Sequence, residues 1–173
     1  SDDPSPLNIY GKSKLAGEVA VCAAMQKNAI IIRTSWLYSE YSNNFVDTIL
    51  RKAQKFDELS VVSDQFSSPT NASDLAKVII QIINHKKFRD YDQLTQIYHY
   101  SSYGVCSWFE FAREILELAN IDCQVNPIET KDYLTAARRP KYSLLNTDKI
   151  VKSFDLEIPF WKDSLKEYID NLL

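Results

Sequence analysis

Apolar residues follow two patterns at the start of the chain. Residues 7–28 show helical spacing that predicts a long helix with a broad buried stripe of Leu15, Val19, Val21, Ala24 and Met25. Pro6 in the first turn, preceded by Asp2, Asp3 and Ser5, marks the start of this helix. Residues 29–32 form a continuous apolar run, typical of a strand buried on both faces of a parallel sheet. A helix followed directly by such a strand indicates α/β architecture, with functional groups at the carboxyl end of the strand.

The same two patterns continue along the rest of the chain. They predict helices at 45–53, 75–83, 107–120, 147–154 and 160–172, strands at 59–62, 97–100 and 123–128, a polar loop at 63–70, a surface loop at 85–93 and an irregular basic stretch at 131–142. Asn43 and Asn44 can cap the helix that follows them. Ser107 and Glu110 have the spacing of a capping box.

The composition excludes several classes of protein. A chain of 173 residues with 45% hydrophobic residues can bury a core, and a net charge of -3 offers no basic surface for nucleic acid or anionic membranes. The three cysteines lie far apart, which favours reduced thiols and a cytoplasmic protein. The two histidines, His85 and His99, are isolated, so we expect no metal site.

Glycine is scarce in this chain. Its three glycines, Gly11, Gly17 and Gly104, do not form the closely spaced set that follows a strand in a dinucleotide-binding turn. Any nucleotide-dependent function must therefore account for that absence.

Tyr10 and Lys14 are four residues apart on the first predicted helix, so their side chains share one face. An ammonium beside a phenol favours the phenolate, and such a pair can transfer protons. By itself the spacing is weak evidence, because a tyrosine and a lysine fall four residues apart by chance, as a packed tyrosine beside a solvated lysine.

Several motifs together carry a more specific resemblance. The segment from Tyr10 to Lys14 resembles the YxxxK segment of the extended short-chain dehydrogenase/reductases that modify nucleotide sugars. Further motifs narrow the resemblance to the dTDP-4-dehydrorhamnose reductases: RTSWLY at 33–38, NNFV at 43–46, DQF at 64–66, SPT at 68–70, DLA at 74–76, YH at 98–99, SWFEFA at 107–112 and RP at 139–140. The match extends over essentially the whole chain but over only the later part of the family's length.

The resemblance implies a C-terminal part of a Rossmann-like, doubly wound parallel sheet plus a small mixed α/β region. Residues 1–36 would hold the catalytic helix and strand of the nucleotide-binding fold. Residues 37–173 would form mostly the substrate-binding region, with 71–100 returning to the main sheet. The family's glycine-rich half would be missing, which would explain the scarcity of glycine.

The resemblance also implies an activity. The intact enzyme would use NADPH, or NADH, to reduce dTDP-4-dehydrorhamnose to dTDP-L-rhamnose. Tyr10 would be the general acid, Lys14 would assist it, and both would contact the cofactor together with Thr34 and Ser35. We expect this chain alone not to bind the cofactor tightly.

The substrate contacts implied by the resemblance come from four stretches. They are Trp36, Asn43, Asn44, Gln65, Phe66 and Arg139, with Arg138 beside the last. Alternative roles are a core aromatic for Trp36, helix caps for Asn43 and Asn44, and a solvated basic turn for the arginines.

Two other functions stay open from the sequence. The chain could be a non-catalytic sugar-nucleotide-binding or regulatory module, or belong to another nucleotide-sugar epimerase or dehydratase; the retained Tyr10 and Lys14 favour an enzyme. If the upstream strands are absent, the strand at 29–32 has a free apolar edge, so a homo-oligomer through that edge, marginal stability or a rearranged sheet is expected.

Overall fold

The helices and strands of the protein come from a computed structural model, which describes residues 3–41, 43–89, 94–133 and 139–172. The helices are α1 (Ile9–Ala24), α2 (Phe45–Ala53), α3 (Ala72–Asn84), α4 (Lys86–Arg89), α5 (Trp108–Leu118), α6 (Asp148–Phe154) and α7 (Trp161–Leu172), with a 3-10 turn η1 (Thr130–Asp132). The strands are β1 (Ile30–Arg33), β2 (Leu37–Tyr38), β3 (Glu58–Val62), β4 (Phe66–Ser67), β5 (Thr70–Asn71), β6 (Gln96–His99), β7 (Cys106–Ser107) and β8 (Gln124–Ile128).

Parallel pairing of the strands confirms the predicted α/β class. In the described part of the chain, the strands form four two-stranded pairs: β1–β6, β2–β5 and β3–β8 are parallel, and β4–β7 is antiparallel. Segments about 65 residues apart in the sequence therefore lie side by side, as where Ile31 faces Ile97. Among the described helices, none is long and apolar enough to cross a membrane.

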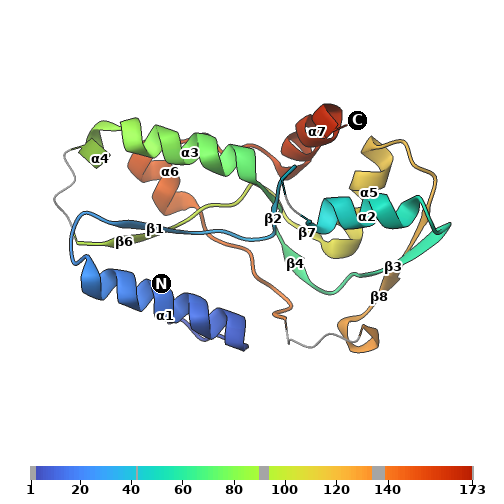
Figure 1. The fold of residues 1–173 in the computed structure, drawn as a ribbon, viewed down its shortest axis with the longest axis horizontal. Helices are drawn as coiled ribbons and strands as arrows, with labels where there is room; N and C mark the ends of the chain where they lie inside the picture. Colours follow the sequence, from blue (N-terminus) through green and yellow to red (C-terminus); the bar gives the residue numbers. More distant parts are fainter. Residues whose placement is uncertain (1–2, 42, 90–93, 134–138, 173) are drawn as a thin grey trace.

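Two hydrophobic clusters hold these elements together. One joins α2, α5, α7 and β3 through buried residues such as Val46, Ile115 and Leu165. The other joins α3, α6 and β6 through residues such as Ile82 and Ile150. They occupy opposite ends of the molecule, the first on the right and the second on the left in Figure 1.

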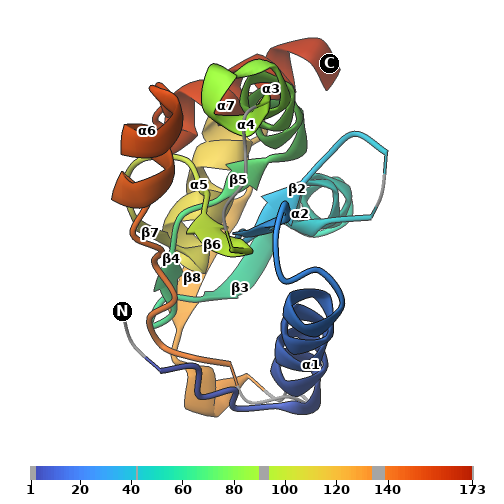
Figure 2. The ribbon, with the colours of Figure 1, turned by 90° about the vertical axis from the view of Figure 1, so that its left-hand side faces the viewer.

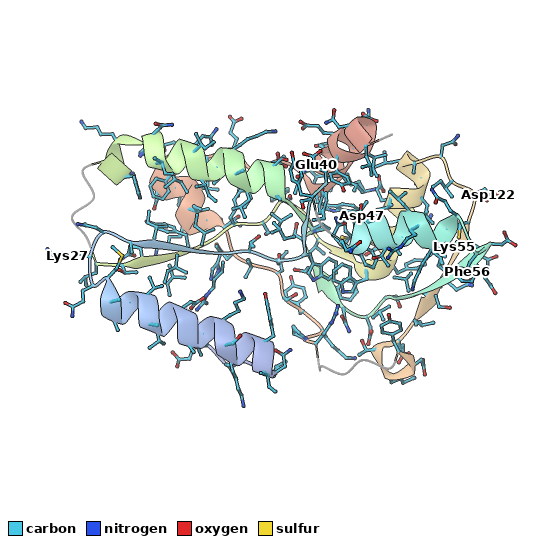
Figure 3. All side chains as sticks on the ribbon, viewed as in Figure 1. Lys27, Glu40, Asp47, Lys55, Phe56 and Asp122 are labelled. Carbon is cyan, nitrogen blue, oxygen red and sulfur yellow. The ribbon has the colours of Figure 1, made fainter. Side chains whose placement is uncertain are left out.

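Local helix signals in the sequence correctly predicted the starts of α2 and α5. The Ser107 N–H donates to Glu110 Oε2 at 2.6 Å, and the Glu110 N–H donates to Ser107 Oγ at 3.1 Å, which completes the capping box. Asn44 Oδ1 accepts a hydrogen bond from the Val46 N–H at 2.9 Å and so caps α2. Asp47, labelled in Figure 3, lies in the first turn of α2, where the negative charge of a carboxylate interacts favourably with the helix dipole.

The prediction for α1 was wrong in extent and in burial. The helix begins at Ile9 after its cap Asn8, so Pro6 precedes it, and it ends at Ala24. No residue of α1 is buried, and the expected stripe is largely exposed at Val19, Val21 and Met25. The reason lies in the arrangement: α1 is on the opposite side of the β1–β6 pair from α3 and α6, and it stands off from the strands (Figures 1 and 2).

Other expectations also need correction. All four residues of β1 are only half-buried, because the cleft towards α1 leaves one face of the strand open. The loop expected at 63–70 contains β4 and the first residue of β5, and the loop expected from His85 contains α4. On α3, Val78 and Ile82 are buried whereas Ile79 and Ile83 are exposed, because only one face of that helix meets the second cluster.

Candidate functional site

Tyr10 and Lys14 lie next to each other on α1, as their spacing predicts. Asn8 fixes the start of the helix by accepting a hydrogen bond from the Gly11 N–H at 2.8 Å. Lys14 Nζ lies over the Tyr10 ring, 5.4 Å from its centroid, which is a cation–π contact. The Tyr10 side chain is 70% exposed, so its phenol is accessible to a ligand.

A cleft of about 570 Å³ separates α1 from β1. Tyr10, Lys14 and Glu18 line it from the helix, and Arg33 and Thr34 line it from the end of the strand. The carboxyl end of a parallel strand is the usual place for a ligand in such folds. The structure thus brings the two predicted catalytic residues to the strand end.

An ion pair connects the two walls of this cleft. Arg33 donates from Nε to Glu18 Oε1 at 2.7 Å and from Nη2 to Glu18 Oε2 at 2.6 Å. The hydrogen bond to Glu18 raises the pKa of Arg33 above its ordinary value. Glu18 was not among the predicted site residues, although it follows Lys14 by one turn and shares the helix face with Tyr10.

Only one of the two hydroxyl residues predicted to contact the cofactor lines the cleft. Thr34 is exposed and lines it. Ser35 instead donates its Oγ–H to the Ser68 carbonyl oxygen at 3.0 Å, so its hydroxyl ties the end of β1 to the segment before β5. The structure therefore groups Thr34, but not Ser35, with Tyr10 and Lys14.

Trp36 connects the strand end to a second cavity. Its φ of +46° lies in the left-handed region, which is uncommon for a bulky residue. Its ring stacks on that of Trp108, with centroids 3.5 Å apart and planes 12° apart. Phe45 contacts Trp108 in turn at 4.5 Å between centroids. One face of the Trp36 indole is thus covered by Trp108.

The second cavity, of about 230 Å³, lies between α2, β3 and the segments that flank residues 134–138. Its aromatic lining includes Trp108 and Tyr133, and its polar lining includes Gln65, Lys52 and Arg139. Flat rings suit a nucleobase, and ammonium and guanidinium groups suit phosphate oxygens. The lining thus combines side chains of the kinds that contact bases and phosphate groups, which is the basis of the function proposed below. We call this cavity the nucleotide cavity.

The nucleotide cavity gathers some of the predicted substrate residues and not others. Gln65 and Arg139 line it, whereas Asn43, Asn44 and Phe66 do not. Asn44 uses its side chain within the chain, because Nδ2 donates to the Ser39 carbonyl oxygen at 2.6 Å and Oδ1 caps α2. Phe66 is fixed by strand pairing in β4, and Asn43 is exposed before α2.

The lining residues missed from the sequence include Lys52, Trp108 and Tyr133. Trp108 stands inside the motif at 107–112 and Tyr133 inside the basic stretch at 131–142, so both were near recognised signals. Lys52 carried no signal of its own. Arg138, considered together with Arg139, lies outside the described residues. Across the described residues, no group of three or more acidic, histidine or cysteine side chains is arranged to hold a metal ion.

Comparison with known proteins identifies the family of this chain. The family model described as the RmlD substrate binding domain matches residues 1–173, the entire chain. The chain belongs to the RmlD substrate-binding domain family.

Members of the RmlD family with known names or structures resemble this chain over almost all of its residues. It is 38% identical to dTDP-4-dehydrorhamnose reductase of Sinorhizobium fredii, over 99% of this chain and 59% of that protein. The crystal structure of the dTDP-4-dehydrorhamnose reductase of Clostridium acetobutylicum superposes with a TM-score of 0.89 at 40% identity, over 99% of this chain and 58% of that one. The Bacillus anthracis enzyme, solved in complex with NADP, gives a TM-score of 0.88 at 39% identity, with the same coverage. The chain thus spans somewhat more than half the length of these relatives.

Proposed function

We propose that this chain supplies the proton-donating pair and the sugar-nucleotide site of a dTDP-4-dehydrorhamnose reductase. The whole protein would reduce dTDP-4-dehydrorhamnose to dTDP-L-rhamnose with NADPH. The observation that carries the proposal is the nucleotide cavity, in which aromatic and cationic side chains meet. Its Trp108 stacks on Trp36, which follows directly on the strand end beside Tyr10 and Lys14.

In the proposed reaction Tyr10 donates the proton. Reduction of the C4 ketone of the sugar produces an alkoxide, and the Tyr10 phenol protonates it. Lys14 would assist Tyr10, since its Nζ lies over the Tyr10 ring, 5.4 Å from the centroid. General acid catalysis of this kind contributes about 10²–10⁴-fold to the rate.

The residues of the α1–β1 cleft fit one end of the cofactor. NADPH, when bound, supplies the hydride. The Tyr10 phenol, the Lys14 ammonium and the Thr34 hydroxyl all line this cleft and suit the hydroxyl groups of a ribose. Gly11 and Gly17 are inside α1, so the described residues include no glycine-rich cradle for the cofactor diphosphate. We therefore expect the chain by itself to bind NADPH no more tightly than about millimolar.

The substrate would extend from the nucleotide cavity towards the α1–β1 cleft. Arg139 and Lys52 would pair with the diphosphate, and Trp108, Tyr133 and Gln65 would surround the thymine base. Trp36, stacked on Trp108, would offer its remaining surface to the sugar.

The division of the chain follows from the same proposal. Residues 1–36 would belong to the nucleotide-binding fold and 37–173 mostly to the substrate-binding region, with 71–100 returning to the main sheet. Pairing of β6 with β1 supports that return. The unpaired thiols of Cys22, Cys106 and Cys123 support a reducing compartment, and we propose the cytoplasm.

The binding part of this proposal is tested by calorimetry of the chain with thymidine 5′-diphosphate. Arg139→Ala should weaken binding about tenfold or more, because a charge-assisted bidentate contact to phosphate is lost. Arg113→Ala on α5 is the matched control, since Arg113 does not line the nucleotide cavity, and it should leave the affinity unchanged. Equal effects of both substitutions, or no binding by the unaltered chain, would refute the assigned site.

A second candidate is a non-catalytic sugar-nucleotide-binding module, which would use the nucleotide cavity without any role for Tyr10. The Tyr10→Phe variant distinguishes the two functions. NADPH oxidation with dTDP-4-dehydrorhamnose is measured for the protein that carries this chain, with and without the substitution. The reductase loses about 10²–10⁴-fold in kcat with an unchanged affinity for thymidine 5′-diphosphate. A module shows no turnover in either form.

A further inference from the structure

The carboxylate of Asp64 joins two segments that lie far away in the sequence. Asp64 follows β3, and its Oδ1 accepts hydrogen bonds from the Thr130 N–H at 2.8 Å and from the Thr130 Oγ1–H at 2.5 Å. Its Oδ2 lies 3.3 Å from Lys141 Nζ. One side chain thus contacts residues on both sides of the stretch 134–138.

Neighbours of Asp64 reinforce both contacts. Gln65 Nε2 donates to Thr130 Oγ1 at 3.0 Å, so the Thr130 hydroxyl is bonded from two consecutive residues. The Phe66 N–H donates to the Lys141 carbonyl oxygen at 2.8 Å. The segment 64–66 therefore serves as a common anchor for residues near 130 and near 141.

The anchored segments carry two residues of the nucleotide cavity. Thr130 begins η1, and the Tyr133 N–H that closes this turn donates to the Thr130 carbonyl oxygen at 3.3 Å. Arg139 precedes Lys141 by two residues. Tyr133 and Arg139 both line the nucleotide cavity, and both are exposed, so core packing does not fix their positions. Their placement depends on the contacts of Thr130 and Lys141.

We propose that Asp64 is a positioning residue for the binding of a nucleoside diphosphate. It would act through Thr130 and Lys141 to place Tyr133 and Arg139 against the ligand. This inference rests on the function proposed above and names a residue that lies outside the cavity lining.

The charge of Asp64 is compatible with this role. A carboxylate beside a diphosphate would repel it if its charge were unbalanced. Asp64 is instead bonded to Thr130 and paired with Lys141, and these contacts hold its pKa below the ordinary value. Because Lys141 is largely exposed, its ion pair is weak, and the two hydrogen bonds from Thr130 carry most of the anchoring.

The test compares four variants of the full chain. Asp64→Ala removes the acceptor, and Thr130→Val removes the hydroxyl while keeping the size of the side chain. Thr130→Ser restores the hydroxyl. Asp170→Ala removes an exposed carboxylate on α7 and controls for net charge. Hydrogen exchange of residues 130–133 is measured without ligand, and affinity for thymidine 5′-diphosphate is measured by calorimetry.

We expect Asp64→Ala and Thr130→Val to speed up exchange at 130–133 and to weaken thymidine 5′-diphosphate binding about tenfold, the scale of one charge-assisted hydrogen bond. Thr130→Ser and Asp170→Ala should bind thymidine 5′-diphosphate with an affinity within about twofold of that of the unaltered chain. If Asp64 contributed to stability alone, its substitution would lower the unfolding midpoint. Exchange at 130–133 and ligand affinity would then not change together, and Thr130→Ser would not restore both.

The outcomes separate this inference from the proposed function. Unchanged exchange at 130–133 in Asp64→Ala overturns the anchoring, whatever the ligand does. Faster exchange with unchanged affinity overturns the positioning role. If the unaltered chain does not bind thymidine 5′-diphosphate at all, the proposed nucleotide site fails and the positioning role fails with it, while the exchange data still decide the anchoring.

Discussion

The ion pair between Glu18 and Arg33 should hold α1 against the rest of the chain. No residue of α1 is buried, so the helix has little apolar area with which to dock. The two charged side chains, by contrast, are 16% and 31% exposed and form a bidentate pair at 2.6 and 2.7 Å. We therefore predict that Glu18→Gln loosens α1 without unfolding the two hydrophobic clusters.

The size of the effect follows from the contact. Hydrogen bonds to charged groups contribute roughly 1.5–3 kcal/mol, and partial exposure of Arg33 places this pair near the lower end. A loss of about 1.5 kcal/mol corresponds to about tenfold faster local opening. Hydrogen exchange followed by mass spectrometry should show this acceleration in α1, whereas α5, which lies in the first cluster, keeps its protection.

Glu157→Gln, a change of the same type at an exposed position, is the matched control and should leave exchange in α1 unaltered. Arg33→Lys keeps the charge but loses the paired donors, so it should resemble Glu18→Gln. Unchanged exchange of α1 in both Glu18→Gln and Arg33→Lys would refute the docking role of the pair. Acceleration spread equally over α1 and α5 would indicate global destabilisation instead.

Three further outcomes are expected. Gly104→Ala should destabilise the chain by about 3 kcal/mol in urea unfolding, because φ at this position is +95° and the new Cβ would lie 2.3 Å from Phe160. Gly17→Ala should instead stabilise the chain by up to about 1 kcal/mol, because the new Cβ on α1 meets open space. Burial and nearby Arg33 lower the pKa of His99 in the folded chain, so His99 takes up its proton more readily in the unfolded chain. The free energy of unfolding should therefore fall as the pH drops below about 6.5. His99→Gln should reduce this fall when unfolding is measured across pH. Within the described residues β1 pairs only with β6, and its second edge predicts concentration-dependent association in light scattering, which a monomer at high concentration would contradict.

Local chemistry made part of the fold predictable. The capping box at Ser107 and the amide cap at Asn44 depend on residues within one turn, so the starts of α5 and α2 could be recognised. Burial of α1 could not be predicted in the same way. An apolar stripe shows which face can be covered, but its burial depends on a partner element distant in the sequence.

The functional residues could likewise be predicted where a local motif marks them, but not where their role depends on contacts between distant segments. Gln65 and Arg139 were identified through motif resemblance, and the structure groups them in the nucleotide cavity. Asp64 belongs to the same motif as Gln65, yet its bonds to Thr130 join residues 66 positions apart, a pairing that no local pattern encodes. Lys52 was missed because a lysine on an exposed helix face has no distinguishing feature in the sequence.

The central claim is that the nucleotide cavity binds the nucleotide of a dTDP-sugar while Trp36 contacts the sugar. The most direct measurement is NMR of the tryptophan indole N–H groups during titration of the ¹⁵N-labelled chain. Thymidine 5′-diphosphate should shift the resonance of Trp108, and dTDP-L-rhamnose should shift that of Trp36 further, while buried Trp161 stays unchanged. An unshifted Trp108 at saturating ligand would contradict the account.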